Sequence, residues 1–203
     1  MYSITAFNKN NAMSNKPINI LLLLFIGLFS VPEKASAQQS VSFQVFYDEL
    51  SPYGNWIDDP IYGYVWVPSL GSSFIPYGTN GYWAYTDWGW TWVSNYSWGW
   101  APFHYGRWYN DAFYGPVWVP DYAWGPGWVN WRSSNAYYGW CPMAPGYGHG
   151  NNAYNDYWTF VDYNDFGRRD INRHYIGRSR NTTILNSTTV INNNRRDNSR
   201  NVS

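Results

Sequence analysis

Aromatic residues alternate with glycine and polar residues through the middle of the chain, and this pattern repeats at a fixed interval. Trp66, Trp92 and Trp118 follow one another 26 residues apart, and each ends a stretch of an aromatic residue, glycine, two further residues and Trp-Val. A Gly-x-Trp triplet precedes each stretch, with its tryptophan at Trp56, Trp83 and Trp108. A fixed period is typical of repeat proteins. The chain therefore contains three tandem copies of one small unit.

Each unit predicts one β-hairpin. If Gly-x-Trp opens one strand and Trp-Val ends the next, Trp56 lies opposite Trp66 across a turn centred on Ile61. Asp59, Pro60 and Gly63 around that centre are turn residues, and the glycine supplies a positive φ. The other units follow the same construction, with a loop one residue shorter in the middle one; their facing pairs are Trp108 with Trp118 and Trp83 with Trp92.

An all-β domain of tandem hairpin repeats is therefore predicted over residues 51–142. This segment has no apolar residues at helical spacing and is interrupted repeatedly by proline. Because residues two apart on a strand share a face, Trp88, Trp90 and Trp92 are expected to line one side of the middle hairpin. A lone hairpin is only marginally stable in water. The three hairpins must associate, either as one curved meander or as a small barrel.

Two further segments, 98–102 and 138–142, resemble each other and are expected to be additional strands. Two copies are too few for the ring of a β-propeller. Ahead of the repeats, residues 38–50 are expected to form a leader strand, because apolar and polar residues alternate from Val41 to Val45.

Composition changes after the repeats. Residues 143–163 are expected to be a loop, with a possible docking strand over 157–161. Residues 164–203 are rich in Arg and Asn and almost free of aromatic residues, so they should bury too little apolar surface to become ordered. A disordered, flexible C-terminal tail is expected, with transient strand character around Ile184 and Val190.

The first 37 residues are expected to be a signal peptide. Lys9 and Lys16 form a basic start, residues 18–31 form an apolar run, and residues 35–37 read Ala-Ser-Ala, a small-x-small cleavage site. The alternative is a membrane anchor, but this run is shorter than the roughly 20 residues that cross a bilayer. We therefore expect export to the periplasm or cell surface, with no transmembrane segment after cleavage. Translation from Met13 would keep Lys16 as the basic end.

Charge is divided between the two ends of the mature chain. Residues 38–163 hold two Arg against nine acidic residues, whereas residues 164–203 hold eight Arg against three Asp. A formal net charge of zero therefore says little about partners. Basic and aromatic residues are segregated rather than interleaved, so no nucleic acid is expected as a partner. The lone Cys141 cannot form an internal disulfide and is expected to be a small buried residue.

The block from Trp98 to Trp108, with the later segments 117–120 and 139–142, resembles an uncharacterised family of exported bacterial domains rich in Tyr-Gly-Trp repeats. The resemblance covers roughly residues 53–142. It implies an envelope location and a shared fold, and it adds no catalytic residue. Cys141 stands where the resemblance leads us to expect alanine.

Aromatic rings are the chemistry that this chain holds in excess. Fourteen Trp and thirteen Tyr lie within residues 51–142, more than one side of a sheet can hide. A contiguous patch of exposed rings would mark a binding surface, and such rings stack against sugars. The candidate ligand-binding residues are Tyr82, Trp88, Trp90, Trp92, His104 and Arg107.

We therefore expect a non-catalytic envelope protein that binds a glycan or another envelope component through exposed Trp and Tyr. The alternative is a structural or assembly module whose aromatic residues pack between copies. A glycan hydrolase is a further alternative, and it needs two carboxylates about 5 to 9.5 Å apart. The available acids are Asp58, Asp59, Asp87, Asp111 and Asp121, and all but Asp121 fall in or near predicted turns. No His or Cys pair has metal-ligand spacing, and no cofactor is expected.

Overall fold

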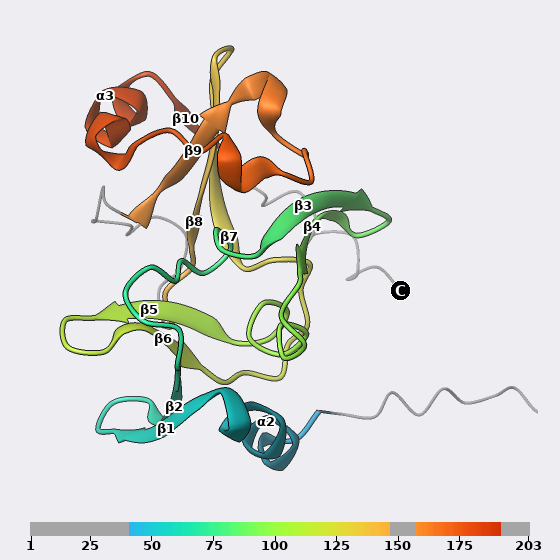
Figure 1. Cartoon of the computed structure of the whole chain (residues 1–203), viewed down its shortest axis with the longest axis vertical. Coiled ribbons are helices and arrows are strands. Elements are labelled where there is room, and N and C mark those ends of the chain that lie inside the picture. The colour runs from blue at the N-terminus through green and yellow to red at the C-terminus, as the bar shows by residue number, and fades with distance from the viewer. Residues whose placement is uncertain (1–40, 147–156, 192–203) are drawn as a thin grey trace, which may run out of the picture. The chain divides into compact units, whose positions relative to one another are not determined.

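The computed structural model describes residues 41–146 and 157–191, which form three antiparallel sheets with short helices (Figure 1). This confirms the all-β prediction. The predicted signal peptide, residues 147–156 of the predicted loop and residues 192–203 of the predicted tail lie outside the described residues. Within the described residues, no helix combines the length and the apolar character needed to cross a membrane.

The first and third repeat units share one four-stranded sheet in the order β1-β2-β6-β5. Its strands are β1 (Gly54–Asp59), β2 (Gly63–Pro68), β5 (Arg107–Asp111) and β6 (Gly115–Val119). Trp56 lies opposite Trp66, and Trp108 lies opposite Trp118, as predicted. The two hairpins join through one residue pair, Trp66 with Trp118.

The middle unit stands apart as a two-stranded sheet of β3 (Gly81–Thr86) and β4 (Gly89–Ser94), with Trp83 opposite Trp92. Its loop of residues 87–88 is one residue shorter than the loops 60–62 and 112–114, as predicted. Because the middle unit does not pair with its neighbours in the sequence, the hairpins form neither one continuous meander nor a closed barrel.

A third sheet, in the order β10-β7-β8-β9, contains a fourth hairpin. Its strands are β7 (Val129–Ser133), β8 (Tyr137–Pro142), β9 (Thr159–Asp162) and β10 (Thr189–Ile191). Trp131 lies opposite Trp140 in the β7–β8 hairpin. The 26-residue period does not predict this hairpin, although its two tryptophans have the same spacing as Trp83 and Trp92.

Close packing against tryptophan explains the glycine that opens each repeat. A methyl group on Gly54 or Gly81 would lie 2.6 or 2.5 Å from the indole of Trp66 or Trp92 on the partner strand. Gly106 is related to Trp118 in the same way, at 2.6 Å. The glycine that opens the second strand has a different role, because its φ is positive, as at Gly89, where it is 88°. The first glycine of the motif is therefore required by close packing, and at Gly106 also by a positive φ of 67°, whereas the second is required by its positive φ.

Buried tryptophans form the core and also anchor the connecting segments. Nine of the fifteen indole side chains are buried. Four of them donate their ring N–H to a backbone carbonyl at 2.7 to 3.1 Å. The donor and acceptor pairs are Trp66 with Leu50, Trp108 with Pro102, Trp118 with Tyr105, and Trp140 with Tyr77. The same side chains therefore fill the core and hold the loops in place.

The leader segment 38–50 was predicted to be a strand, and this prediction is wrong, because α2 (Phe43–Leu50) is a helix followed by the single turn η1 (Ser51–Tyr53). The Ser42 hydroxyl caps the helix by accepting from the backbone N–H of Val45 at 3.4 Å. Phe46 and Leu50, four residues apart on one helix face, are fully buried. Burial of Phe46 and Leu50 on one helix face stabilises the helix more than the short alternation of apolar and polar residues from Val41 to Val45 favours a strand.

Segment 98–102 was predicted to be a strand, and this prediction is also wrong. Its residues form consecutive turns, in which the N–H of Ala101 donates to the Trp98 carbonyl at 3.2 Å and that of Phe103 to Gly99 at 3.3 Å. The similar segment 138–142 does lie in a strand, β8. The segments differ because only the second one has partner strands on both sides.

The predicted tail is folded as far as residue 191. It contains the short helices η3 (Tyr163–Asp165), η4 (Ile171–Arg173), η5 (Arg178–Arg180) and α3 (Asn181–Asn186), followed by β10. Ile184, expected in a strand, lies buried in α3, whereas Val190 lies in β10 as expected. The expected docking strand is β9, which pairs with β8.

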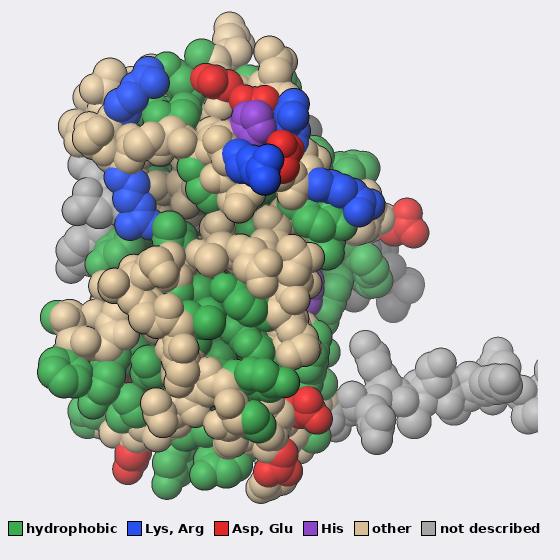
Figure 2. All heavy atoms as spheres, viewed as in Figure 1, with side chains coloured by type: hydrophobic (Ala, Val, Ile, Leu, Met, Phe, Trp, Pro, Cys, Tyr) green, Lys and Arg blue, Asp and Glu red, His purple; other side chains and the backbone are tan. Residues whose placement is uncertain are grey.

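A few well-placed contacts explain why this Arg-rich segment is ordered. Arg132 in β7 donates to the Thr188 hydroxyl at 3.0 Å and to the carbonyls of Leu185 and Thr188 at 3.0 and 2.7 Å. Phe166 stacks on Tyr138 with ring centroids 4.2 Å apart. Figure 2 shows basic side chains gathered over the part formed by β9, β10 and α3, away from the hydrophobic side chains over the first sheet.

Candidate functional site

Two exposed tryptophans meet at the surface beside the middle hairpin. Trp88 is 63 % exposed and Trp124 is 41 % exposed, and their ring centroids lie 5.2 Å apart at an interplanar angle of 67°. The Trp124 ring also stacks on His104, with centroids 5.7 Å apart and an angle of 14°. We call Trp88, Trp124 and His104 the indole surface. It presents aromatic groups from three separate segments of the chain.

Backbone hydrogen bonds fix the loop that carries Trp124. This loop, residues 120–128, connects β6 to β7, and its Pro126 carbonyl accepts the N–H of Trp92 in β4 at 2.8 Å. The N–H of Gly125 donates to the His104 carbonyl at 2.8 Å, and His104 Nδ1 lies 3.0 Å from the Gly125 carbonyl oxygen. The loop is therefore hydrogen-bonded both to β4 and to the segment that carries His104.

Burial lowers the pKa of His104, and the hydrogen bond to the Gly125 carbonyl opposes that shift in part. The imidazole is therefore neutral at pH 7. Since a carbonyl can only accept, Nδ1 carries the proton and Nε2 is left as an acceptor. His104 thus adds an uncharged polar edge to the indole surface.

Trp128 connects this surface to Arg107. Its ring N–H donates to the His104 carbonyl at 3.0 Å, and the Arg107 guanidinium carbon lies 3.4 Å from its ring centroid. Such cation–π stacking holds a guanidinium in one orientation. Burial lowers the pKa of Arg107, while attraction to Asp121 and Tyr77 raises it.

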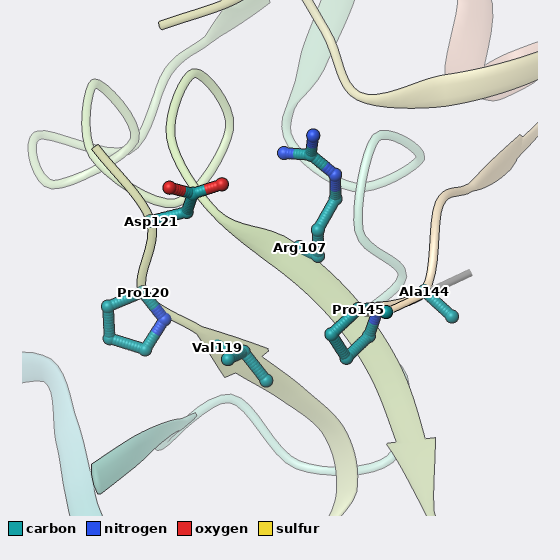
Figure 3. A pocket seen from close by; sticks show the side chains of 7 residues that line it. Arg107, Val119, Pro120, Asp121, Ala144 and Pro145 are labelled. Atoms are coloured by element: carbon teal, nitrogen blue, oxygen red, sulfur yellow. The ribbon is translucent and has the colours of Figure 1, made fainter. Parts of the chain in front are cut away.

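Arg107 lines an open pocket of about 390 Å³ (Figure 3). The other walls are residues 119–121, which end β6 and begin the following loop, and residues 144–146, which follow β8. Figure 3 shows the Arg107 and Asp121 side chains on the same side of the pocket, with Val119 and Pro145 nearer its other side. The pocket therefore combines one cation, one carboxylate and several apolar side chains.

The predicted site residues do not all come together. Trp88, His104 and Arg107 lie in this region, but Trp92 is fully buried in the core. Trp90 is half-buried, with its ring centroid 4.6 Å from that of Phe166. The predicted row of three indoles on one face is wrong, because Trp88 lies in the two-residue loop and the face shared by Trp90 and Trp92 is the packed one.

Tyr82, the remaining predicted residue, lies on the face of β3 opposite that of Trp83. It lies opposite Val93 in the β3–β4 hairpin, in the register that alternates with the Trp83–Trp92 pair. The Arg169 guanidinium carbon lies 5.3 Å from the Tyr82 ring centroid. Tyr82 therefore contacts the C-terminal segment.

Residues 47–147 match a family of unknown function, DUF6600. The DUF6600 match runs from α2 to just beyond β8 and leaves out β9, α3 and β10. It includes the indole surface and the Arg107 pocket, and the family description assigns no activity. No curated protein matches the chain, and no solved structure matches it.

Sequence reasoning missed three residues of this region inside the DUF6600 match: Trp124, Trp128 and Asp121. Trp124 and Trp128 lie outside the 26-residue period, between the third and fourth hairpins. Tryptophans that break a repeat have no facing partner on the neighbouring strand, and this feature could have identified them. Asp121 follows Pro120 and was considered only as a hydrolase carboxylate.

The turn acids have structural roles, as their positions predicted. Asp59 accepts the backbone N–H of Ile61 and Tyr62 at 2.8 and 2.9 Å, and these bonds lower its pKa. Asp111 accepts those of Phe113 and Tyr114 at 2.7 and 2.8 Å. In the part of the chain that the structure describes, no three His, Cys, Asp or Glu side chains gather in a way that could hold a metal ion.

Proposed function

We propose that this protein is a non-catalytic exported envelope protein that binds a glycan through the indole surface. One observation carries the proposal: Trp88 and Trp124 remain 63 % and 41 % exposed and in contact, in a chain that buries nine of its tryptophans. Exposed aromatic clusters on soluble domains commonly mark binding surfaces.

The chemistry of the indole surface suits a sugar. The flat faces of aromatic rings pack against apolar C–H groups, and the indole N–H is a further donor. His104 Nε2 is an acceptor, and the neutral imidazole does not repel uncharged hydroxyl groups. A pyranose ring offers apolar faces and hydroxyl edges of this kind.

The indole surface is preorganised, which favours ligand binding. The loop 120–128 is bonded to β4 and to the His104 segment, so few rotatable groups need to be ordered when a ligand arrives. Lower ordering cost raises affinity for the same contact area. We therefore assign the surface a recognition role, and hydrolysis remains a further alternative.

Export rests on the basic start, apolar run and Ala-Ser-Ala site of residues 1–37. It places the proposed ligand among the glycans of the cell envelope. Amino-terminal sequencing of the protein from the envelope fraction tests this part, and a mature chain that begins at Gln38 is expected. A chain that keeps residues 18–31 would favour the membrane-anchor alternative.

A structural or assembly module is the second candidate, and the hairpin tips favour it. Ile61 in the first hairpin is 79 % exposed, and Phe113 in the third hairpin is 87 % exposed. Large apolar side chains at loop tips are available for contact with another copy. Sedimentation velocity of the ligand-free protein, with Ile61→Ser and Phe113→Ser together, tests this candidate: self-association that the double variant removes would favour it.

Retention on purified peptidoglycan and on insoluble polysaccharides tests the glycan proposal. Trp88→Ala and Trp124→Ala should each reduce retention about tenfold, because each removes one ring from the contact. Tyr85→Ala is the matched control, since Tyr85 lies in the same hairpin and is 73 % exposed outside the indole surface. If the wild-type protein is not retained on any glycan, or if both tryptophan variants are retained fully, the proposal is wrong.

A further inference from the structure

The Arg107 pocket is built from three segments that backbone hydrogen bonds lock together. Arg107 pairs with Val119 across the β5–β6 ladder. The N–H of Trp108 donates to the Met143 carbonyl at 3.3 Å, and the N–H of Met143 donates to the Trp128 carbonyl at 2.9 Å. The walls are therefore positioned before any ligand arrives.

Arg107 is oriented, yet the described residues use little of its hydrogen-bonding capacity. A guanidinium has five N–H donors, and among the described residues Arg107 donates one hydrogen bond, from Nη1 to the Gly106 carbonyl at 2.8 Å. Arg132 differs, because three hydrogen bonds from its guanidinium hold the C-terminal segment. Arg107 is half-buried and stacked on Trp128, so its orientation is fixed. Unlike Arg132, it does not hold another segment of the described chain in place.

Asp121 adds a negative charge to the pocket and leaves the Arg107 guanidinium available to a ligand. Its Oδ1 accepts the backbone N–H of Tyr122 at 2.6 Å. The carboxylate attracts Arg107 electrostatically, but no ion pair joins the two described side chains. A ligand can therefore meet both a guanidinium fork and a carboxylate acceptor in one pocket.

We propose that this pocket binds the carboxylate of an acidic sugar, with Arg107 holding the carboxylate and Asp121 accepting a hydrogen bond from a neighbouring sugar hydroxyl. The planar guanidinium matches a carboxylate through two parallel hydrogen bonds. Asp121 disfavours a doubly charged phosphate, because like charges repel within such a pocket. The inference deepens the proposed function, since it names the class of glycan and relies on the indole surface for the neighbouring sugar units.

Trp128 links the two parts of the proposed site. The same indole that carries Arg107 donates to the backbone carbonyl of His104, whose ring stacks on Trp124. A glycan of several units could therefore place one acidic unit at Arg107 and further units along the aromatic rings. Affinity should then depend on both ends of the site.

Isothermal titration of the purified protein with four probes tests the inference. The probes are a galacturonate trimer, the methyl ester of that trimer, free galacturonate and galactose 6-phosphate. The last two compare a carboxylate with a phosphate. The trimer should bind about tenfold more tightly than its ester, and free galacturonate more tightly than the phosphate. Equal affinity for trimer and ester would overturn the inference while leaving the proposed function in place.

Variants assign the effect to the pocket. Arg107→Gln and Arg107→Lys should each remove most of the preference for the trimer over the ester, since Lys keeps the charge but lacks the fork. Arg169→Gln is the matched control, because it also removes an arginine that lies over an aromatic ring. Asp121→Asn changes an exposed side chain and should raise affinity for the phosphate relative to galacturonate. An unchanged preference in Arg107→Gln, or an equal loss in Arg169→Gln, would overturn the inference.

The indole surface supplies the readout that separates the two proposals. If Trp88→Ala weakens trimer and ester equally, the aromatic contact is shared and the preference belongs to Arg107. If the trimer binds through Arg107 but not through Trp88 or Trp124, the pocket stands and the proposed aromatic recognition fails. If neither trimer nor ester binds the wild-type protein, both proposals are wrong.

Discussion

Replacing Gly81 by alanine should destabilise the fold by forcing a methyl group against Trp92. The new Cβ would lie 2.5 Å from Cζ2 of Trp92 and 2.6 Å from the Val93 carbonyl oxygen. Carbon atoms in contact prefer about 3.5 to 4 Å, so the ring must move by roughly 1 Å. Trp92 is fully buried between Tyr77, Trp83 and Phe103, which leaves it little room to move.

The size of this effect follows from packing alone. Nε1 of Trp92 has no hydrogen-bond partner in the described part of the chain, so moving the ring breaks no side-chain hydrogen bond. Overpacking of this kind costs about 2 to 3 kcal/mol. For a domain of this size the loss corresponds to roughly 4 to 12 °C in Tm.

Gly89→Ala provides the comparison, because a methyl group there meets nothing within 4 Å but the backbone has φ of 88°. Its cost should be about 1 to 2 kcal/mol, and Asn in place of Ala should recover part of it, since Asn tolerates the left-handed region. At Gly81, Asn should be worse than Ala. Thermal unfolding followed by near-ultraviolet circular dichroism measures all four variants.

A double-mutant cycle completes the test. Trp92→Leu opens space beside residue 81, so Gly81→Ala should cost much less in that background than in the wild type. Two losses that simply add would refute the steric reasoning, because independent sites are additive. An unchanged Tm in Gly81→Ala alone would refute it as well.

Three further predictions concern other parts of the molecule. Burial lowers the pKa of His104 below its unfolded value of about 6.5, so the unfolded chain binds a proton at a higher pH than the folded chain does. The free energy of unfolding of the wild type should therefore fall relative to that of His104→Gln as the pH drops below that value, and the difference between the two should be constant above pH 7. Urea denaturation from pH 5 to 8 measures this, and a difference that does not change with pH would contradict it. Burial raises the pKa of the Cys141 thiol to about 12, so thiol reagents at pH 8 should label the folded protein far more slowly than the protein in urea, and equal rates would show that Cys141 is accessible. Arg132→Gln should release α3 and β10 to proteolysis while leaving β1 to β6 protected, because two carbonyls and one hydroxyl lose their donor; cleavage throughout the chain would contradict a local role.

Local pairing could be predicted from the sequence because it depends on spacing. The distance from Trp56 to Trp66 and from Trp83 to Trp92 sets the hairpin register and even the loop lengths. The association of the hairpins could not be predicted, since the Trp66–Trp118 pair joins units one and three across the whole of unit two. No periodicity encodes which sheet edges meet.

The candidate site was harder to predict because exposure depends on tertiary packing. Trp88 and Trp92 are four residues apart in the middle repeat unit, yet one is 63 % exposed and the other is fully buried. Trp88 lies in the turn at residues 87–88, whereas Trp92 lies in β4. The folded C-terminal segment was missed for a related reason, because single residues such as Phe166 and Ile184 meet complementary positions on the third sheet.

The pairing of the first and third hairpins limits how this protein can change in evolution. Many repeat proteins lengthen or shorten by whole units, because each unit contacts only its neighbours. Here the middle unit is bypassed by the sheet that its neighbours share. Deletion of the first or third copy would uncover the strand edge that the other copy pairs with, so these two copies depend on each other, whereas the connections between copies are free to vary.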